Sequence, residues 1–66
     1  MEKYVGVGDR VKVKSSYFVE GYHIPQGTEF EITFVDRQGI PYCCRCLTVP
    51  ITMWLRRDQF DIVKQL

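Results

Sequence analysis

The sequence predicts an all-β fold, a small five-stranded barrel that forms a single domain over residues 1–66. Three observations predict it. The chain is close to the lower size limit of about 50 residues for an independent domain. Apolar and polar residues alternate along most of it, as in half-buried strands, and no window has the apolar period of an amphipathic helix. Five short strands must curl to cover their faces and edges, which favours a barrel over an open sheet.

The first two predicted strands have a clear alternation. In residues 10–14, two valines alternate with three basic residues, which predicts a half-buried strand with a basic outer face. In residues 28–34, we expect Phe30, Ile32 and Phe34 to point inward. The residues between them point outward: Glu29, Glu31 and Thr33.

The second half of the chain is divided by turn residues. Asp36 to Gly39 predicts a turn, because the glycine can adopt positive φ. Residues 56–59 span a single helical turn, which is too short for a stable α-helix and suits a 3₁₀ turn. The apolar segments between these turns, with a boundary at Pro50, are the remaining predicted strands: residues 40–49, 51–55 and 60–64.

The segment of residues 15–27 follows neither period. It is thirteen residues long and contains Tyr17, Phe18 and Tyr22. Loops of this length are uncommon in compact domains and are often functional. We expect a loop that folds back on the barrel, where its aromatic residues either bind a ligand or seal the open end.

The inward positions of the strands form the expected core. Cys44 and Cys46 share the inward face of their strand, where free cysteines behave as small buried hydrophobes. Two alternatives remain open: a metal site in which the three cysteines and His23 converge, and a reactive thiol at Cys43. We expect neither a metal nor a cofactor. The core positions are Val11, Val13, Phe30, Ile32, Phe34, Cys44, Leu55 and Ile62.

Charge and motif content narrow the function classes. The net charge of +1 argues against a polycationic nucleic-acid binder and an acidic DNA mimic. No segment is long and apolar enough for a signal peptide or a membrane span. Three clustered cysteines fit reduced thiols in the cytoplasm. The carboxylates are dispersed, His23 has no catalytic partner at a recognised spacing, and no phosphate-binding glycine loop is present. We therefore expect no enzyme, no small-molecule substrate and no membrane partner.

Two short motifs carry a resemblance to a known architecture. Pro25-Gln26-Gly27-Thr28 opens a strand after the long aromatic loop, and Trp54-Leu55 is followed by Asp58-Gln59-Phe60-Asp61-Ile62-Val63. Over about residues 7–64 the chain resembles small SH3-like barrel proteins of bacterial and bacteriophage type, related in architecture to SH3 and KOW-like domains. The resemblance implies a long RT-like loop after the first strand and a 3₁₀ turn before the last.

The resemblance also implies a binding face. In peptide-binding SH3 domains, RT-loop aromatics and a tryptophan form a groove for proline-rich ligands. Tyr17, Tyr22 and Trp54 fall in comparable segments, with Glu20 as an acidic neighbour. Phe60 stands where the family often has a groove tyrosine. Trp54 points outward if its two neighbours point inward. We therefore expect a small accessory or inhibitor protein, of phage type, that binds a protein partner through an aromatic face.

The alternative function is a KOW- or Tudor-like barrel that binds nucleic acid. Its contacts would be phosphate contacts from basic side chains, combined with stacking on aromatic side chains. The candidate residues lie on the first strand and in the 3₁₀ turn: Lys12, Lys14, Arg56 and Arg57. Acidic residues beside them offset part of this charge.

Overall fold

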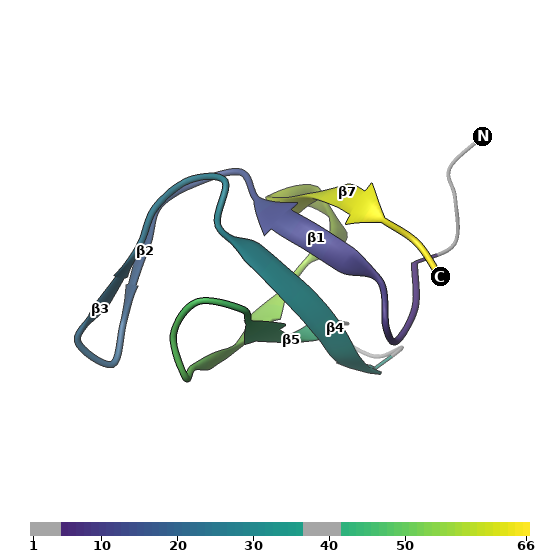
Figure 1. Cartoon of the computed structure of the whole chain (residues 1–66), viewed down its shortest axis with the longest axis horizontal. Coiled ribbons are helices and arrows are strands. Elements are labelled where there is room, and N and C mark those ends of the chain that lie inside the picture. Colours follow the sequence, from purple (N-terminus) through teal and green to yellow (C-terminus); the bar gives the residue numbers. More distant parts are fainter. Residues whose placement is uncertain (1–4, 37–41) are drawn as a thin grey trace.

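The computed structural model describes residues 5–36 and 42–66. In this part of the chain every regular element is a strand except one 3₁₀ turn, which confirms the all-β prediction (Figure 1). The elements are β1 (Arg10–Val13), β2 (Tyr17–Val19), β3 (Tyr22–Ile24), β4 (Glu29–Val35), β5 (Tyr42–Cys46), β6 (Thr52–Leu55), η1 (Arg57–Gln59) and β7 (Phe60–Lys64).

Five of these strands form one antiparallel sheet in the order β6-β5-β4-β1-β7. The predicted number of sheet strands is confirmed, as is the 3₁₀ turn before the last strand. The sheet is not a closed barrel, because β6 and β7 are its two ends and do not pair with each other in the described residues. The chain crosses between them through η1, and apolar side chains cover the inner face.

The segment predicted as a loop contains a β-hairpin formed by β2 and β3. Its two-residue turn consists of Glu20 and Gly21, with φ values of 50° and 84°. Positive φ at both turn positions is typical of the tight turns that match the twist of a hairpin. The hairpin projects from the sheet (Figure 1), and Phe18 is 81% exposed. The expectation that Phe18 seals the barrel is therefore wrong, whereas Tyr17 and Val19 of the same segment do pack against the core.

The strand that follows residues 37–41 is shorter than predicted. We expected it over residues 40–49, but β5 ends at Cys46 and the chain then bends. At this bend the Leu47 N–H donates to the Glu29 carbonyl and the Cys46 N–H to the Ile51 carbonyl. Residues 37–41, which include most of the predicted turn and the first two residues of that strand, lie outside the described residues.

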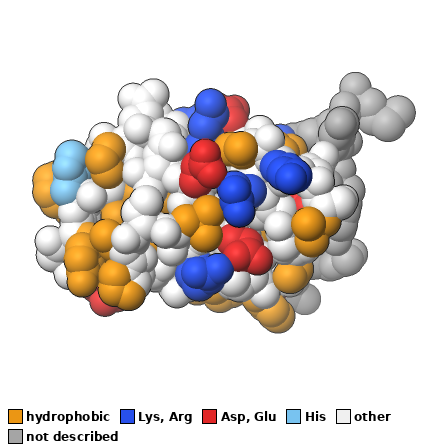
Figure 2. Space-filling view, in the orientation of Figure 1, with side chains coloured by type: hydrophobic (Ala, Val, Ile, Leu, Met, Phe, Trp, Pro, Cys, Tyr) orange, Lys and Arg blue, Asp and Glu red, His pale blue; other side chains and the backbone are white. Residues whose placement is uncertain are grey.

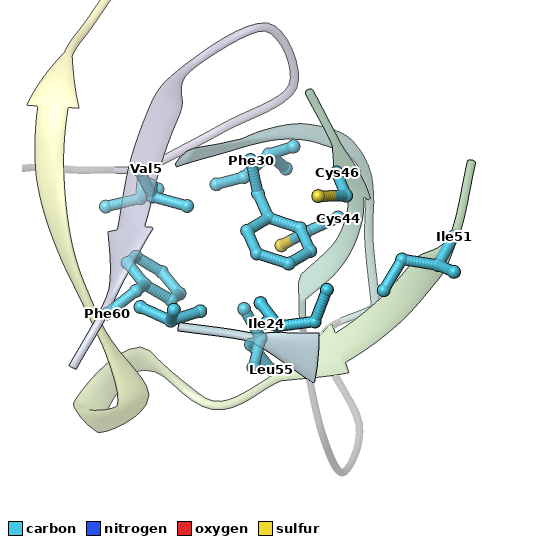
Figure 3. Close-up of a cluster of buried hydrophobic side chains, with 11 residues drawn as sticks. Val5, Ile24, Phe30, Cys44, Cys46, Ile51, Leu55 and Phe60 are labelled. Atoms are coloured by element: carbon cyan, nitrogen blue, oxygen red, sulfur yellow. The ribbon is translucent and has the colours of Figure 1, made fainter. Parts of the chain in front are cut away.

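Most of the predicted core is confirmed. Val11, Val13, Phe30, Ile32, Cys44 and Leu55 are fully buried, whereas Ile62 is half-buried against them. Further side chains from the first turn, the base of the hairpin and the last strands join this cluster (Figure 3). They are Val5, Ile24, Cys46, Ile51 and Phe60. Ile24 connects the hairpin to the core, so the base of the hairpin is anchored although its tip is exposed.

The inward prediction for Phe34 is wrong, because this side chain is 54% exposed. Ile32 pairs with Cys44, but Phe34 pairs with Cys43, so the register shifts by one residue at Thr33. Such a β-bulge moves the residues after it to the opposite face of the sheet. The bulge therefore places Phe34 on the outer face.

One buried carboxylate connects the first turn with the end of β7. The Asp9 side chain accepts hydrogen bonds from the N–H of Gly6 (2.9 Å), the N–H of Leu66 (3.2 Å) and the side-chain amide of Gln65 (3.3 Å). Burial alone would raise the pKa of Asp9. The three hydrogen bonds together lower it by more than burial raises it, so the pKa lies below its usual value.

Candidate functional site

An exposed aromatic pair lies on the outer face of the sheet. Phe34 and Trp54 are 54% and 47% exposed, and their rings meet edge to face with centroids 6.1 Å apart. Phe34 on β4 and Trp54 on β6 each pair with Cys43, which lies on β5 between them. The orientation expected for Trp54 is thus observed. We call Phe34 and Trp54 the outer aromatic pair.

A shallow cavity of about 540 Å³ adjoins this pair. Phe34 belongs to its wall, so the cavity borders the outer aromatic pair. Val7 and Leu66, which also line it, are both exposed. The full lining consists of Gly6, Val7, Asp9, Phe34, Val35, Gln65 and Leu66. The wall is thus mixed: apolar side chains lie beside the Asp9 carboxylate, which already accepts three hydrogen bonds.

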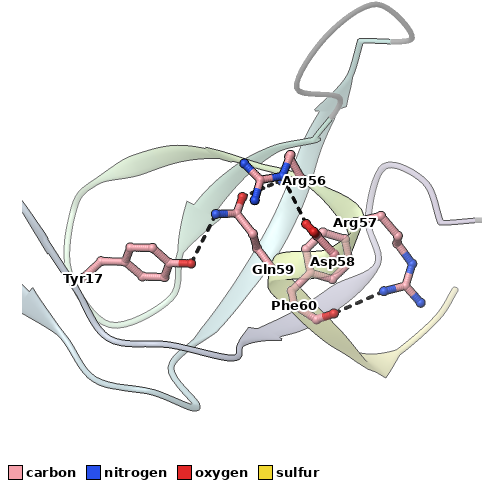
Figure 4. A network of polar contacts seen from close by, with 6 residues as sticks. All are labelled: Tyr17, Arg56, Arg57, Asp58, Gln59 and Phe60. Atoms are coloured by element: carbon pink, nitrogen blue, oxygen red, sulfur yellow. Dashed lines mark hydrogen bonds and ion pairs between the residues drawn. The ribbon is translucent and has the colours of Figure 1, made fainter.

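The hairpin carries the other predicted site residues. The Tyr17 hydroxyl accepts a long hydrogen bond of 3.5 Å from the Gln59 side-chain amide, which joins the base of the hairpin to η1 (Figure 4). Glu20 lies at the tip, and Tyr22 is exposed. The ring of Phe18 stacks on His23 with centroids 4.8 Å apart. This stacked pair was not predicted as a binding feature, although both residues belong to the segment that the sequence singled out.

The structure separates Trp54 from the hairpin. Phe34 lies five residues beyond the start of β4, about 16 Å along the strand, and Trp54 contacts Phe34. The hairpin precedes the other end of β4 (Figure 1). In the described residues no ring contact joins Trp54 to Tyr17 or Tyr22. The predicted aromatic face is therefore two surfaces. Phe60, at the family's groove position, is fully buried against Tyr42.

Acidic partners surround the basic residues of the alternative site. Lys14 is 3.8 Å from Asp61, and Lys12 lies across the sheet between Glu29 and Asp61. Figure 2 shows the same interleaving of positive and negative side chains over the middle of this face. A phosphate backbone would thus meet paired charges on β1.

The two arginines beside η1 are also engaged. Arg56 is 3.2 Å from Asp58, and Arg57 donates to the Phe60 carbonyl at 3.1 Å (Figure 4). The Arg57 guanidinium also lies over the Phe60 ring, 5.2 Å from its centroid. Both arginines therefore contribute to the structure of the turn.

The three thiols are free and differ in their surroundings. Burial, with a contribution from Cys43, raises the pKa of Cys44 to about 12. Burial also raises the pKa of Cys46, but hydrogen bonds from Thr48 and from the backbone of residues 47–49 lower it below its usual value. Cys43 is half-buried on the outer face.

No ligand set for a metal converges in the described part of the chain. Within residues 5–36 and 42–66, no three side chains among histidine, cysteine, aspartate and glutamate are grouped closely enough to hold an ion. His23 lies on the hairpin against Phe18, whereas the cysteines lie on β5. The same residues contain no helix long and apolar enough to cross a membrane.

Comparisons with protein families, curated proteins and solved structures find no significant match to this chain.

Proposed function

We propose that the chain is a non-enzymatic binding module that uses the outer aromatic pair to bind a protein partner, in the manner of a small accessory or inhibitor protein of phage type. The observation that carries this proposal is the joint exposure of Phe34 and Trp54 beside a shallow cavity. Large aromatic side chains on one exposed patch are common anchors of protein interfaces, where a few residues supply most of the binding energy.

The SH3-like architecture is part of this proposal. The sheet order, read from the other end, is β7-β1-β4-β5-β6, which places the last strand beside the first and the middle strands in sequence. A long hairpin joins β1 to β4, and a 3₁₀ turn precedes β7. These features support the arrangement that the resemblance implies.

We also propose that the chain has no catalytic activity. Glu31 is paired with Arg45 at 2.7 Å, and the Asp9 carboxylate is occupied by its three hydrogen bonds. His23 is stacked on Phe18. These contacts support structural roles for the groups that could act as acids or bases. The three free thiols support a reducing compartment such as the cytoplasm.

Partner capture with matched aromatic variants tests the binding proposal. The wild-type chain, Trp54→Ala and Phe18→Ala would be immobilised and exposed to cell lysate, with and without nuclease. We expect Trp54→Ala to lose the captured protein and Phe18→Ala to retain it, because Phe18 lies on the hairpin. A hot-spot aromatic contributes about 2 kcal/mol or more, so the loss should be at least about 30-fold.

Two results would contradict the proposal. Loss of capture with Phe18→Ala alone would assign binding to the hairpin with Tyr17, Glu20 and Tyr22. Loss on nuclease treatment would support nucleic acid, and replacing Lys12 or Lys14 would then reduce the salt dependence of binding. The ion pairs around β1 argue against this second outcome.

A further inference from the structure

A buried carboxylate lies in the wall of the cavity beside the outer aromatic pair. Asp9 lines this cavity and is only 6% exposed. The residues whose N–H groups bind its carboxylate line the same cavity: Gly6, Gln65 and Leu66. Because these donors surround it from the cavity wall, the carboxylate is held in one position at the edge of the cavity.

The charge of this carboxylate is not neutralised within residues 5–36 and 42–66. The ion pairs there involve four carboxylates that are exposed to solvent: Glu29, Glu31, Asp58 and Asp61. None of these pairs includes Asp9, although its lowered pKa keeps it charged at neutral pH. Buried charges in proteins are usually paired with an opposite charge. Here an unneutralised charge lies where a cavity gives access to it.

The carboxylate can accept a further hydrogen bond. A carboxylate has about four lone-pair positions. Oδ2 of Asp9 accepts from the Gly6 N–H and the Gln65 side chain, whereas in the described residues Oδ1 accepts from the Leu66 N–H alone. A new donor can therefore bind Oδ1 without displacing the other three. A cationic donor would also neutralise the charge, which an apolar group would leave unpaired.

The rest of the wall favours one kind of cation. Phe34 exposes an aromatic ring there, and Val7, Val35 and Leu66 are apolar. A guanidinium is planar and weakly hydrated and stacks on aromatic rings, whereas an ammonium is compact and strongly hydrated. The methylene groups of an arginine side chain would cover the apolar part of the wall. The cavity volume of about 540 Å³ is within the usual range of ligand pockets.

We propose that this cavity binds an arginine side chain of the protein partner, whose guanidinium donates to Oδ1 of Asp9 and stacks on Phe34. We call the cavity the arginine pocket. The inference deepens the proposed function and rests on it, because the pocket borders the outer aromatic pair. The partner surface would then have an arginine next to the group that contacts Trp54.

NMR titration with blocked amino acids tests the arginine pocket. The probes are N-acetyl-arginine methylamide, its citrulline analogue, which has the same shape without the charge, and its lysine analogue. We expect the arginine probe to shift the backbone amides of Gly6 and Leu66 over about 1–50 mM, a range suited to a single side chain. The citrulline and lysine probes should bind at least about 5-fold more weakly.

Matched variants test the two side chains that carry the inference. Phe34→Leu keeps an apolar wall without the ring and should weaken binding of the arginine probe about 2- to 30-fold, the range of a cation–π contact. Phe18→Leu removes an exposed ring from the hairpin and should leave binding unchanged. Asp9→Asn, followed at the Val7 amide, should weaken binding at least about 5-fold. Glu20→Gln removes the carboxylate at the hairpin tip and should have no effect.

The possible results distinguish the arginine pocket from the proposed function. The pocket would be overturned if the arginine probe left the Gly6 and Leu66 amides unshifted, or if either analogue bound as tightly as the arginine probe. Equal effects of Phe34→Leu and Phe18→Leu would also overturn it, and this comparison remains if Asp9→Asn does not fold. If the pocket fails while Trp54→Ala still loses the captured protein, the proposed function stands without it. If the arginine probe binds but Trp54→Ala retains the captured protein, the proposed function fails and the pocket stands.

Discussion

At the scale of single residues, Asp9 shows how one carboxylate orders two distant segments. It lies just before β1, and its side chain holds Gly6 on one side and residues 65 and 66 on the other. Leu66 also lies against Gly8, where an added Cβ atom would collide with the leucine side chain. The cavity beside the outer aromatic pair depends on these contacts, because Asp9 and Leu66 both line it.

The lowered pKa of Asp9 gives a pH-dependent stability with a defined sign. Because the folded chain binds the Asp9 proton less tightly than the unfolded chain, protonation favours unfolding. The stabilisation is present above the usual aspartate pKa of 3.8 and is lost as the pH falls through the lower folded pKa. We expect Asp9→Asn to lower the stability at pH 7 by about 1–3 kcal/mol, because one acceptor oxygen becomes an NH₂ donor and leaves at least one N–H group without an acceptor.

Thermal unfolding between about pH 2.5 and about pH 7, the range in which carboxylates titrate, measures this effect. The difference between wild type and Asp9→Asn should be largest at neutral pH and shrink below about pH 4. A constant difference over the whole range would show that Asp9 does not carry the predicted linkage.

At the scale of elements, the hairpin tip holds Glu20 in a backbone conformation that is unfavourable for glutamate. Glu20 has a φ of 50°, a left-handed conformation that costs an L-residue with a Cβ atom about 1–2 kcal/mol. Asparagine adopts this conformation more readily, so Glu20→Asn should stabilise the chain by about 0.5–1 kcal/mol. Glu20→Ala removes the same charge but retains the conformational penalty. Equal thermal stability of the two variants would contradict the turn geometry.

The bulge in β4 gives a contrast between two phenylalanines of the same strand. Phe30 is fully buried, so Phe30→Ala should destabilise the chain by about 3–5 kcal/mol, as expected for a large core side chain. Phe34 is on the outer face, so Phe34→Ala should cost less than about 1 kcal/mol. The melting temperatures of the two variants measure this difference, and similar losses would place Phe34 in the core.

These elements also show what the sequence could predict. Alternation of valines and charges located β1, and the apolar period placed Phe30 and Ile32 correctly. The same period continues through Phe34, so the extra residue at Thr33 leaves no signal in the pattern. A bulge depends on how two strands pair, which a period along one strand does not encode.

The site was less predictable than the strands. Glu20-Gly21 is not the Asn-Gly or Asp-Gly pair that usually marks a two-residue hairpin, so this turn was missed. The exposure of Trp54 follows from alternation, but its contact with Phe34 requires the bulge. The role of Asp9 depends on residues at the opposite end of the chain, which local sequence patterns do not relate.

At the scale of the whole molecule, two of the three cysteines belong to the apolar core. Cys44 and Cys46 are packed among apolar side chains, and His23 lies on the hairpin. We expect the purified chain to contain no stoichiometric zinc, and a chelator to leave its melting temperature unchanged. A structural zinc site would instead couple folding to metal binding. One zinc ion per chain by elemental analysis would contradict this prediction.

The whole fold also separates a buried inner face from an outer face that is free for contact. Trp54 and Leu55 are neighbours on β6, yet Leu55 is fully buried and Trp54 is exposed. The central claim is that Trp54 contributes to binding and little to the fold. The same arrangement underlies the proposed partner surface.

The urea-unfolding free energy of Trp54→Ala, compared with that of Leu55→Ala, tests this claim most directly. Trp54→Ala should unfold cooperatively within about 1 kcal/mol of the wild type. Leu55→Ala should lose about 2–5 kcal/mol, because it removes a core side chain. A loss for Trp54→Ala as large as that for Leu55→Ala would show that the tryptophan belongs to the core and that the outer face lacks its anchor.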